Sequence, residues 1–258
     1  PVLLAARGMK IPFIIHEPNA VLGRANPLFA PGACKVASGF HRLDRVSPSA
    51  ERLVSGNPVR AAVLEAAAAP YAPPSPDGPL RLLVIGGSLG ARILSVTVPK
   101  AVAALPEDLR KRLSVVQQTR AENLEEARAI YKAASVEAVC EPFFDDMGAR
   151  YAAAHLVVSR AGASTVAELS AIGRPAILVP FAAAMDDHQT ANAADLNAAG
   201  AAVVMPESGL APDTLSAELE SLLRDGEALR VRAEAARRCG RPEAHAVLAD
   251  LVEQAASA

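Results

Sequence analysis

Three segments of the sequence place hydroxyl, carboxamide or carboxylate side chains between an apolar run and a helical pattern. In the first segment, the apolar residues 82–85 lead into Gly86, Gly87 and Ser88. Glycines allow a ligand to approach the backbone closely, and the free N–H groups at the start of the following helix favour a phosphate. The hydroxyl of Ser88 adds a donor. The alternative is a tight strand-to-helix turn in which Ser88 only caps the helix.

The second segment joins an expected strand over 156–159 to a helix that we expect over 165–172, ending before Gly173. The hydroxyls of Ser164 and Thr165 and three backbone amides gather at the start of this helix. The segment therefore predicts a second anion site, and a diphosphate would fit between it and the first segment.

Glu168 lies one turn further along the same helix. The spacing from Thr165 to Glu168 is that of a capping box, in which the carboxylate only accepts a hydrogen bond from the Thr165 amide. The alternative is that Glu168 accepts hydrogen bonds from two ribose hydroxyls.

A dinucleotide ligand is disfavoured because the dinucleotide-binding fold requires an acidic residue at the end of the second strand. Here the strand over 113–116 is followed by Gln117 and Gln118.

The third segment, 180–192, carries Gln189 and Asn192 on one face of an expected helix over 189–199. Two neighbouring carboxamides can read sugar hydroxyls. The alternative is a capped helix with a solvated polar face. His188 follows two aspartates, but adjacent residues cannot easily share one coordination sphere, so we expect no metal site.

A fourth polar group, formed by His16, Glu17 and Asn19, follows an expected strand over 11–15. Open α/β sheets bind ligands at the carboxyl edge of their strands, so these side chains could face the other three segments across a cleft. His16 and Glu17 are the candidates for a catalytic base. His16 could equally be an interior histidine.

The elements that must position these residues alternate between short apolar runs and amphipathic stretches. This alternation is typical of a parallel sheet covered by helices on both faces, and it predicts an α/β fold. The expected strands are 11–15, 80–85, 113–116, 136–140, 156–159, 176–179 and 201–204. The expected helices of the C-terminal part are 212–224, 227–238 and 242–256.

The composition limits the classes of function. Hydrophobic residues make up 51% of the 258 residues, which permits a large core. The net charge is -2, aromatic residues make up 3%, and Trp is absent, so no basic or stacking surface for nucleic acid is expected. Cys34, Cys140 and Cys239 are scattered, which indicates free thiols in a reducing compartment. No apolar run approaches the roughly 18 residues of a membrane span.

A turn-rich region separates two expected domains. The residues 55–60 have turn chemistry, and 66–79 form a connection rich in Ala and Pro. We therefore expect a first domain over 1–57, a second over 58–240 and a final helix within 241–258. The first domain is short for a doubly wound unit, so we expect its N-terminal part to be missing from the chain.

Six stretches resemble, in the same order, the motifs of the MurG family. They are HEPNAVLGRAN (16–26), GNPVR (56–60), LLVIGGSLGARIL (82–94), FFDDM (143–147), SRAGASTVAELSAIGRPAILVPF (159–181) and DDHQTANA (186–193). Members of that family are UDP-N-acetylglucosamine:N-acetylmuramyl-(pentapeptide) pyrophosphoryl-undecaprenol N-acetylglucosamine transferases. The resemblance implies a GT-B fold, in which two Rossmann-like domains enclose a cleft and the final helix crosses back onto the first domain.

The resemblance also implies the reaction and its setting. GlcNAc would pass from UDP-GlcNAc to the 4-hydroxyl of lipid-linked N-acetylmuramyl-pentapeptide (lipid I), forming lipid II in peptidoglycan synthesis. Helix N-termini and Arg60 would stabilise the leaving diphosphate, so no cofactor is expected. The enzyme would work in the cytoplasm, at the inner face of the bacterial cell membrane, with contacts to other cell-wall synthesis proteins.

By the same resemblance, the donor site draws on both domains. Phe144 would supply backbone contacts to uracil, Glu168 would hold the ribose, and Gln189 and Asn192 would read the GlcNAc hydroxyls. Asn19 would reach in from the first domain. Residues of the diphosphate region and the helix start complete the substrate-binding set: Arg60, Ser88, Ala163, Ser164, Thr165, Val166 and Ala167.

The sequence departs from the family in three places. The glycine-rich loop ending in His, which carries a candidate base, is absent, and much of the apolar membrane-docking patch is expected in the same missing stretch. Pro18 replaces a Gln, and the residues 117–120 (QQTR) replace His-Gln-(Ser/Thr)-Gly. Two alternatives therefore stay open. One is another GT-B enzyme, such as a lipid glycosyltransferase or a UDP-GlcNAc 2-epimerase, and the other is an inactive UDP-sugar-binding fragment.

Overall fold

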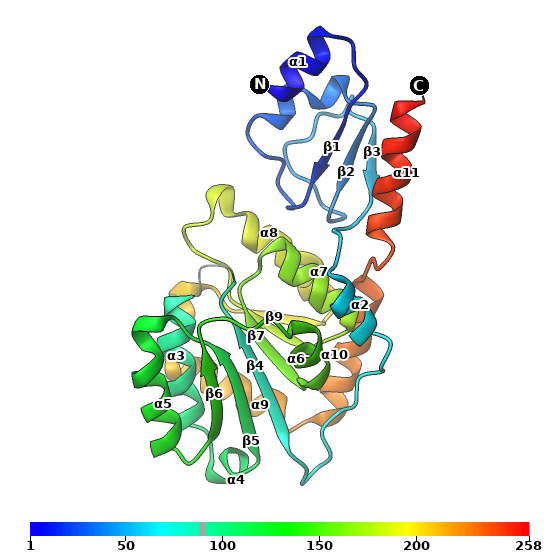
Figure 1. Ribbon diagram of the computed structural model, residues 1–258. Helices are drawn as coiled ribbons and strands as arrows, with labels where there is room; N and C mark the ends of the chain where they lie inside the picture. The colour runs from blue at the N-terminus through cyan, green and yellow to red at the C-terminus, as the bar shows by residue number, and fades with distance from the viewer. Residues whose placement is uncertain (88–90, 258) are drawn as a thin grey trace.

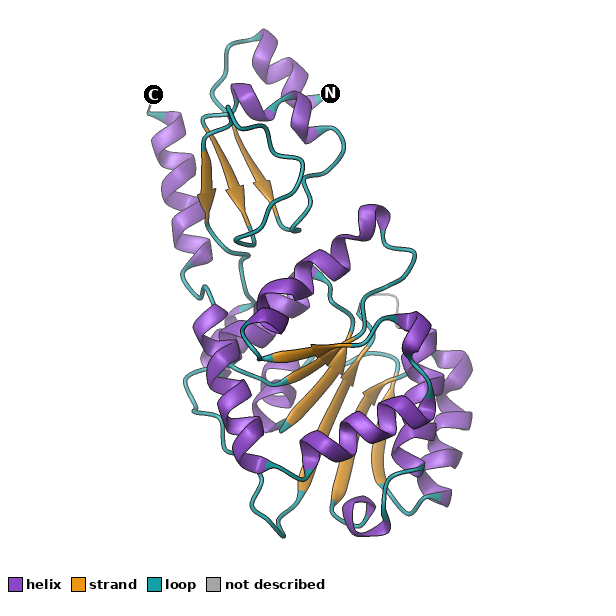
Figure 2. Cartoon of the chain, turned by 180° about the vertical axis from the view of Figure 1, so that it is seen from behind, coloured by secondary structure: helices purple, strands orange, loops and turns teal. Residues whose placement is uncertain are grey.

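The computed structural model describes residues 1–87 and 91–257 (Figure 1). Two parallel sheets, one of three strands and one of six, lie in two separate parts of the molecule, each with helices beside it (Figure 2). The strand order of the larger sheet is β6-β5-β4-β7-β8-β9, which is the doubly wound order. The α/β class predicted from the sequence is confirmed.

The smaller sheet consists of β1 (Ile14–Glu17), β2 (Lys35–Ser38) and β3 (Arg52–Val54), and α1 (Val2–Gly8) precedes it. β1 begins three residues later than the expected strand, because its ladder with β2 pairs Ile14–Glu17 with Lys35–Ser38. β2 and β3 were not predicted. Both are short and contain charged residues, so they show no apolar run.

The six strands of the larger sheet all run parallel. They are β4 (Leu80–Ile85), β5 (Leu113–Gln118), β6 (Glu137–Glu141), β7 (Leu156–Ser159), β8 (Ala176–Leu178) and β9 (Ala202–Val204). Every residue of β4 except Arg81, and every residue of β7, is buried. Such continuous burial is expected for central strands covered on both faces.

Helices cover both faces of this sheet and form two separate apolar cores. One face is covered by α3 (Arg92–Ala103), α5 (Leu124–Ala133) and α9 (Pro212–Leu223), with the short α4 (Glu107–Arg110) at its edge. The other face is covered by α2 (Ala61–Ala66), α6 (Met147–Ala153), α7 (Ala163–Ile172), α8 (His188–Ala198) and α10 (Gly226–Cys239). None of the described helices is both long and apolar enough to cross a membrane.

The chain crosses between the two sheets twice, and the two crossings are adjacent. The first runs from β3 into α2, and the second from α10 into α11 (Ala244–Ala256). α11 lies beside the small sheet and contacts β1 (Figure 1). Gly56 in the first crossing has φ +78, and a Cβ added to it would lie 2.5 Å from the Cβ of Arg241 in the second. Only glycine fits this backbone and this close approach.

Candidate functional site

Two cavities open at the carboxyl edge of the larger sheet. The larger has a volume of about 940 Å³ and the smaller about 370 Å³, which is the usual size range of ligand sites. Gly87, Ser164 and Thr165 line both cavities. The two spaces therefore meet where the turn after β4 faces the start of α7.

The N-terminus of α7 supplies hydrogen-bond donors to this meeting point. The helix begins at Ala163, two residues earlier than expected, and its N-cap residue Gly162 makes no side-chain cap bond. The first amides of a helix lack intrahelical partners, and the helix dipole favours an anion beside them. Gly87 has φ +84, a conformation that glycine adopts without strain. Ser88 lies outside the described residues, so its role stays a prediction.

Gln118 holds the glycine turn in place. Its Oε1 accepts a hydrogen bond from the Gly86 amide at 3.0 Å, and its Nε2 donates to the carbonyl of Gly87 at 3.1 Å and to that of Pro142 at 3.2 Å. Sequence reasoning missed this function. The available signal was a carboxamide at the end of a buried strand, in the stretch that departs from the family motif.

Glu168 is a buried acid that lines the smaller cavity. Arg60 donates to both carboxylate oxygens, from Nε at 2.6 Å and from Nη2 at 2.9 Å. The hydroxyl of Tyr151 donates to the carboxylate at 3.2 Å. Burial and the neighbouring Glu168 raise the pKa of Tyr151 well above 10, so this hydroxyl stays protonated.

The capping-box alternative for Glu168 is wrong. Because α7 begins at Ala163, Thr165 is already inside the helix and is not its N-cap residue. The carboxylate of Glu168 instead faces Arg60 and Tyr151, which come from the first crossing and from α6. The predicted role in ribose binding is therefore the interpretation that stays open for this carboxylate.

The rest of the smaller cavity has a mostly apolar wall. Phe144 is buried and Phe143 is exposed, and both line the space together with Met147. The guanidinium of Arg150 stacks on Phe144 with 4.0 Å between Cζ and the ring centre. Phe144 thus lies in the same cavity as Glu168, as its predicted contact with a base requires.

The larger cavity is lined by three arginines and one carboxamide. Arg92 and Arg120 come from the starts of α3 and of the segment after β5, and Arg160 follows β7. Arg160 is ion-paired with Glu207 across the cavity wall. Gln189 lines the same wall, and its Oε1 accepts a hydrogen bond from the Phe181 amide at 3.0 Å.

Asn192 does not share the environment of Gln189. Its side chain is fully buried, and its Oδ1 accepts a hydrogen bond from the Ala20 amide at 2.8 Å. Its Nδ2 donates to the Oδ1 of Asn19 at 3.2 Å and to the Ala161 carbonyl at 3.1 Å. The structure therefore separates Asn192 from Gln189, because the first domain covers Asn192 and occupies its polar groups, and sugar reading by Asn192 stays a prediction.

Among the described residues, the first-domain candidates His16, Glu17 and Asn19 do not line either cavity. The carboxylate of Glu17 accepts from Asn19, from the Gly23 amide at 2.8 Å and from Asn26, so it organises its own loop. The Nε2 of His16 lies 3.3 Å from the Gly56 carbonyl. These contacts give both side chains a place in the structure of the first domain, and their catalytic role stays a prediction.

Two residues of the predicted substrate-binding set turn away from the cavities. The side chain of Val166 is buried in an apolar core, and Ala167 faces a cavity of about 40 Å³ between the domains. Ala163, Ser164 and Thr165 do line the larger cavity. Within the described part of the chain, no three His, Cys, Asp or Glu side chains are grouped as metal ligands.

Residues 81–251 match the family model of the glycosyltransferase family 28 C-terminal domain. The chain is also 54% identical to a protein of Methylobacterium sp. (strain 4-46), covering 100% of this chain and 70% of that protein. A protein of Maricaulis maris is 52% identical, with 98% and 69% covered. Both relatives are named UDP-N-acetylglucosamine--N-acetylmuramyl-(pentapeptide) pyrophosphoryl-undecaprenol N-acetylglucosamine transferase. The chain belongs to the MurG family.

Solved structures agree with this membership. MurG of Acinetobacter baumannii superposes with a TM-score of 0.80 at 34% identity, covering 98% of this chain and 70% of that one. A Listeria monocytogenes protein described as a UDP-N-acetylglucosamine 2-epimerase reaches a TM-score of 0.65 at 18% identity, covering 96% and 69%. The second likeness reports the shared fold alone. The predicted GT-B fold is confirmed for this member of the MurG family.

Proposed function

We propose that this chain is an inverting N-acetylglucosaminyltransferase with UDP-GlcNAc as donor and lipid I as acceptor, forming lipid II. The names and identities of its MurG relatives support this activity. The observation that carries the proposal is the pair of cavities that meets at α7. The apolar wall and the Glu168 carboxylate of the smaller cavity suit a uridine, and the larger cavity has room for the sugar and for an incoming acceptor.

In this proposal the diphosphate lies over the start of α7. The free amides there, together with the hydroxyls of Ser164 and Thr165, stabilise the negative charge of the leaving UDP. The 4-hydroxyl of the acceptor attacks C1 of GlcNAc from the face opposite the diphosphate. The bond from C1 to the phosphate oxygen breaks, its electron pair leaves with UDP, and a general base takes the hydroxyl proton.

Arg60 changes partner when the donor binds. A buried carboxylate without hydrogen bonds is costly, and Arg60 supplies them to Glu168 in the ligand-free protein. Ribose hydroxyls can replace the guanidinium because they are also donors. The side chain of Arg60 is 55% exposed, so it can move to the adjacent diphosphate, as predicted for it.

The proposal is tested at Glu168. Two hydrogen bonds to a charged group are worth about 1.5–3 kcal/mol each, so Glu168→Ala should weaken UDP binding by about 100-fold or more. Glu168→Gln should keep the fold. The measurement is calorimetry with UDP, with exposed Glu137→Ala as the control. Normal UDP binding by Glu168→Ala, combined with a lower melting temperature, would assign Glu168 a structural function only.

A transfer assay separates the reaction classes. Consumption of UDP-GlcNAc should depend on added lipid I, because a transferase needs an acceptor and an epimerase does not. Consumption without the acceptor would favour the epimerase alternative. Binding of UDP-GlcNAc without any turnover would favour the inactive binding fragment.

The membrane setting is a further part of the proposal. The acceptor carries an undecaprenyl chain, so its sugar must be met at a membrane surface. The first domain exposes several apolar side chains around α1: Val2, Leu4, Met9, Ile11 and Leu28. The chain should sediment together with lipid vesicles, and the double variant Leu4→Ser with Met9→Ser should lower the fraction that sediments. Contacts with other cell-wall synthesis proteins stay a prediction.

A further inference from the structure

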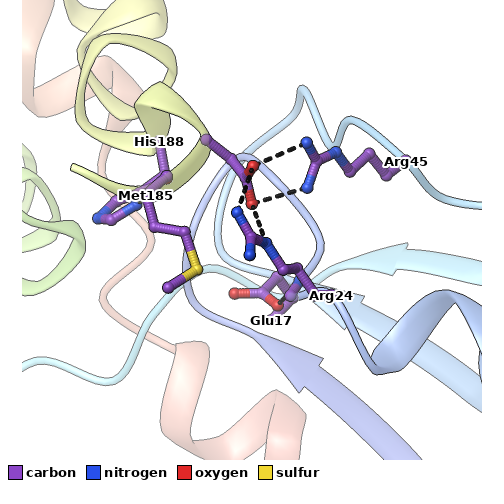
Figure 3. Close-up of polar contacts among 7 residues, drawn as sticks. Glu17, Arg24, Arg45, Met185 and His188 are labelled. Atoms are coloured by element: carbon purple, nitrogen blue, oxygen red, sulfur yellow. Dashed lines mark hydrogen bonds and ion pairs between the residues drawn. The ribbon is translucent and has the colours of Figure 1, made fainter. Parts of the chain in front are cut away.

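One carboxylate of the second domain is held by two arginines of the first. Asp186 lies in a short helix, η4 (Met185–Asp187), just before α8. Arg45 places Nη1 and Nη2 at 2.7 and 2.9 Å from the two oxygens of Asp186, and Arg24 contacts the same oxygens at 3.4 and 3.5 Å. Figure 3 shows Arg24 and Arg45 reaching this carboxylate from two separate segments. Bidentate contacts of this kind fix geometry as well as charge.

The backbone on both sides of this contact is unusual. Asp186, Asp187 and Arg45 have φ values of +57, +53 and +65. They are three of the five non-glycine residues with positive φ among the described residues. Such conformations persist where surrounding structure enforces them, and they concentrate at functional sites.

The loop that presents Arg24 is itself held firmly. The carboxylate of Glu17 is buried and binds the loop at Asn19, Gly23 and Asn26. Glu17 and Arg24 therefore lie close together (Figure 3). The carboxylate that the sequence indicated as a catalytic candidate bonds to the Gly23 amide, next to Arg24, and so orders the loop that carries this arginine.

Gln189 lies between two points of contact with the first domain. Asp186, three residues before it, is held by the arginines, and Asn192, three residues after it, is bonded to Asn19 and Ala20. Gln189 itself lines the larger cavity. The two contacts hold the helical turn that carries Gln189, and the Phe181 amide bonds to its carboxamide.

We infer that Asp186 is a positioning residue for donor-sugar recognition: Arg24 and Arg45 hold it so that Gln189 presents its carboxamide to the GlcNAc of the donor. This inference rests on the proposed function. The first domain then contributes to sugar selection without touching the sugar. UDP, which lacks the sugar, should not depend on Asp186.

The test compares two ligands in calorimetry. Asp186→Asn should weaken UDP-GlcNAc binding by about five- to tenfold and leave UDP binding within twofold of the unmodified chain. Asp186→Glu should restore most of the loss, and the double variant Arg24→Gln with Arg45→Gln should reproduce it. Asp108→Asn is the matched control, because it removes an exposed Asp–Arg pair with Arg224 inside the second domain. Unchanged UDP-GlcNAc binding, or equal weakening of both ligands, would overturn the inference.

A ligand-free readout separates this inference from the proposed function. Hydrogen exchange at the amides of 187–192 should become about tenfold faster in Asp186→Asn, while the amides of 166–170 in α7 keep their rates. Unchanged exchange at 187–192 contradicts the positioning function. Failure of the unmodified chain to bind UDP-GlcNAc would contradict the proposed function, and the exchange result would still decide the function of Asp186.

Discussion

The hydroxyl of Tyr151 orients the carboxylate of Glu168. It is buried and donates to Oε2 of the carboxylate, the oxygen that also accepts from Nη2 of the half-exposed Arg60. In the proposed function a ribose displaces Arg60, and Tyr151 is then the protein donor that stays. It therefore keeps the carboxylate in a fixed orientation while its outer partner changes.

Tyr151→Phe removes this donor without changing the packing of the ring. The loss of one hydrogen bond of about 1 kcal/mol should weaken UDP binding by about fivefold. Calorimetry with UDP measures the effect. Tyr131→Phe is the control, because the Tyr131 hydroxyl bonds to Gln117 in the core and should not influence UDP. Equal affinities of Tyr151→Phe and the unmodified chain would contradict this orientation by Tyr151.

For single residues, the sequence predicted which side chains line a cavity better than it predicted which residues contact them. Glu168 and Gln189 were expected at a ligand site, and each lines one of the two cavities. Asn192 was expected beside Gln189, because residues three apart share a helical face. The first domain covers part of that face through contacts such as the one between Asn192 and Ala20, which are 172 positions apart. Local spacing in the sequence cannot reveal such contacts.

At the scale of elements, α2 and α6 approach closely enough to set the position of Arg60. Arg60 is the N-cap residue of α2, and Gly148 lies in α6. A Cβ added to Gly148 would lie only 2.3 Å from the carbonyl oxygen of Ala62 in α2. A side chain at this position therefore has to push the two helices apart.

Gly148→Ala should consequently destabilise the fold by about 1–3 kcal/mol, as overpacked sites do. It should also weaken UDP binding, because α2 would carry Arg60 away from the proposed place of the diphosphate. Urea unfolding and calorimetry measure the two effects. Gly209→Ala is the control, because a Cβ at Gly209 meets no atom within 4 Å. Normal stability of Gly148→Ala would show that the helices adjust without cost.

The elements themselves were predictable to different degrees. Apolar runs such as 80–85 and 156–159 became the strands β4 and β7 with the same bounds, because central parallel strands are buried on both faces. β2 and β3 stayed hidden, since their partners in the sheet supply the stability that their sequences do not show. The pairing of β1 with β2 likewise moved His16 and Glu17 into the strand.

At the scale of the whole molecule, a buried histidine and an ion-paired aspartate respond to acid in different pH ranges. His155, just before β7, accepts a hydrogen bond from the Arg81 amide at its Nδ1. Burial, with the neighbouring charges of Arg81 and Arg174, lowers its pKa to about 4. The contacts with Arg45 and Arg24 lower the pKa of Asp186 to about 2.

These two pKa values place acid sensitivity in different ranges. As the pH is lowered, the unfolded chain binds a proton at His155 near pH 6.5, whereas the folded protein does so only near pH 4. The free energy of unfolding should therefore decrease as the pH is lowered from about 6.5 to 4. Asp186 should stay charged there, since its contribution is lost only below about pH 4. Urea unfolding at several pH values checks this, and His155→Asn should reduce the slope. An unchanged slope in His155→Asn would assign the acid sensitivity to other groups.

The adjacency of the two crossings, at Gly56 and Arg241, has a mechanical consequence. Both chain segments that connect the domains pass through the same place. The relative motion that they permit most easily is therefore a rotation of one domain against the other about this place. Figures 1 and 2 both show the crossings at one side of the molecule and the start of α8 at the other. The displacement produced by such a rotation grows with distance from its axis. Asp186 lies far from this place, so a rotation of the domains would displace it strongly. Its contacts with two arginines therefore oppose the rotation where they are most effective.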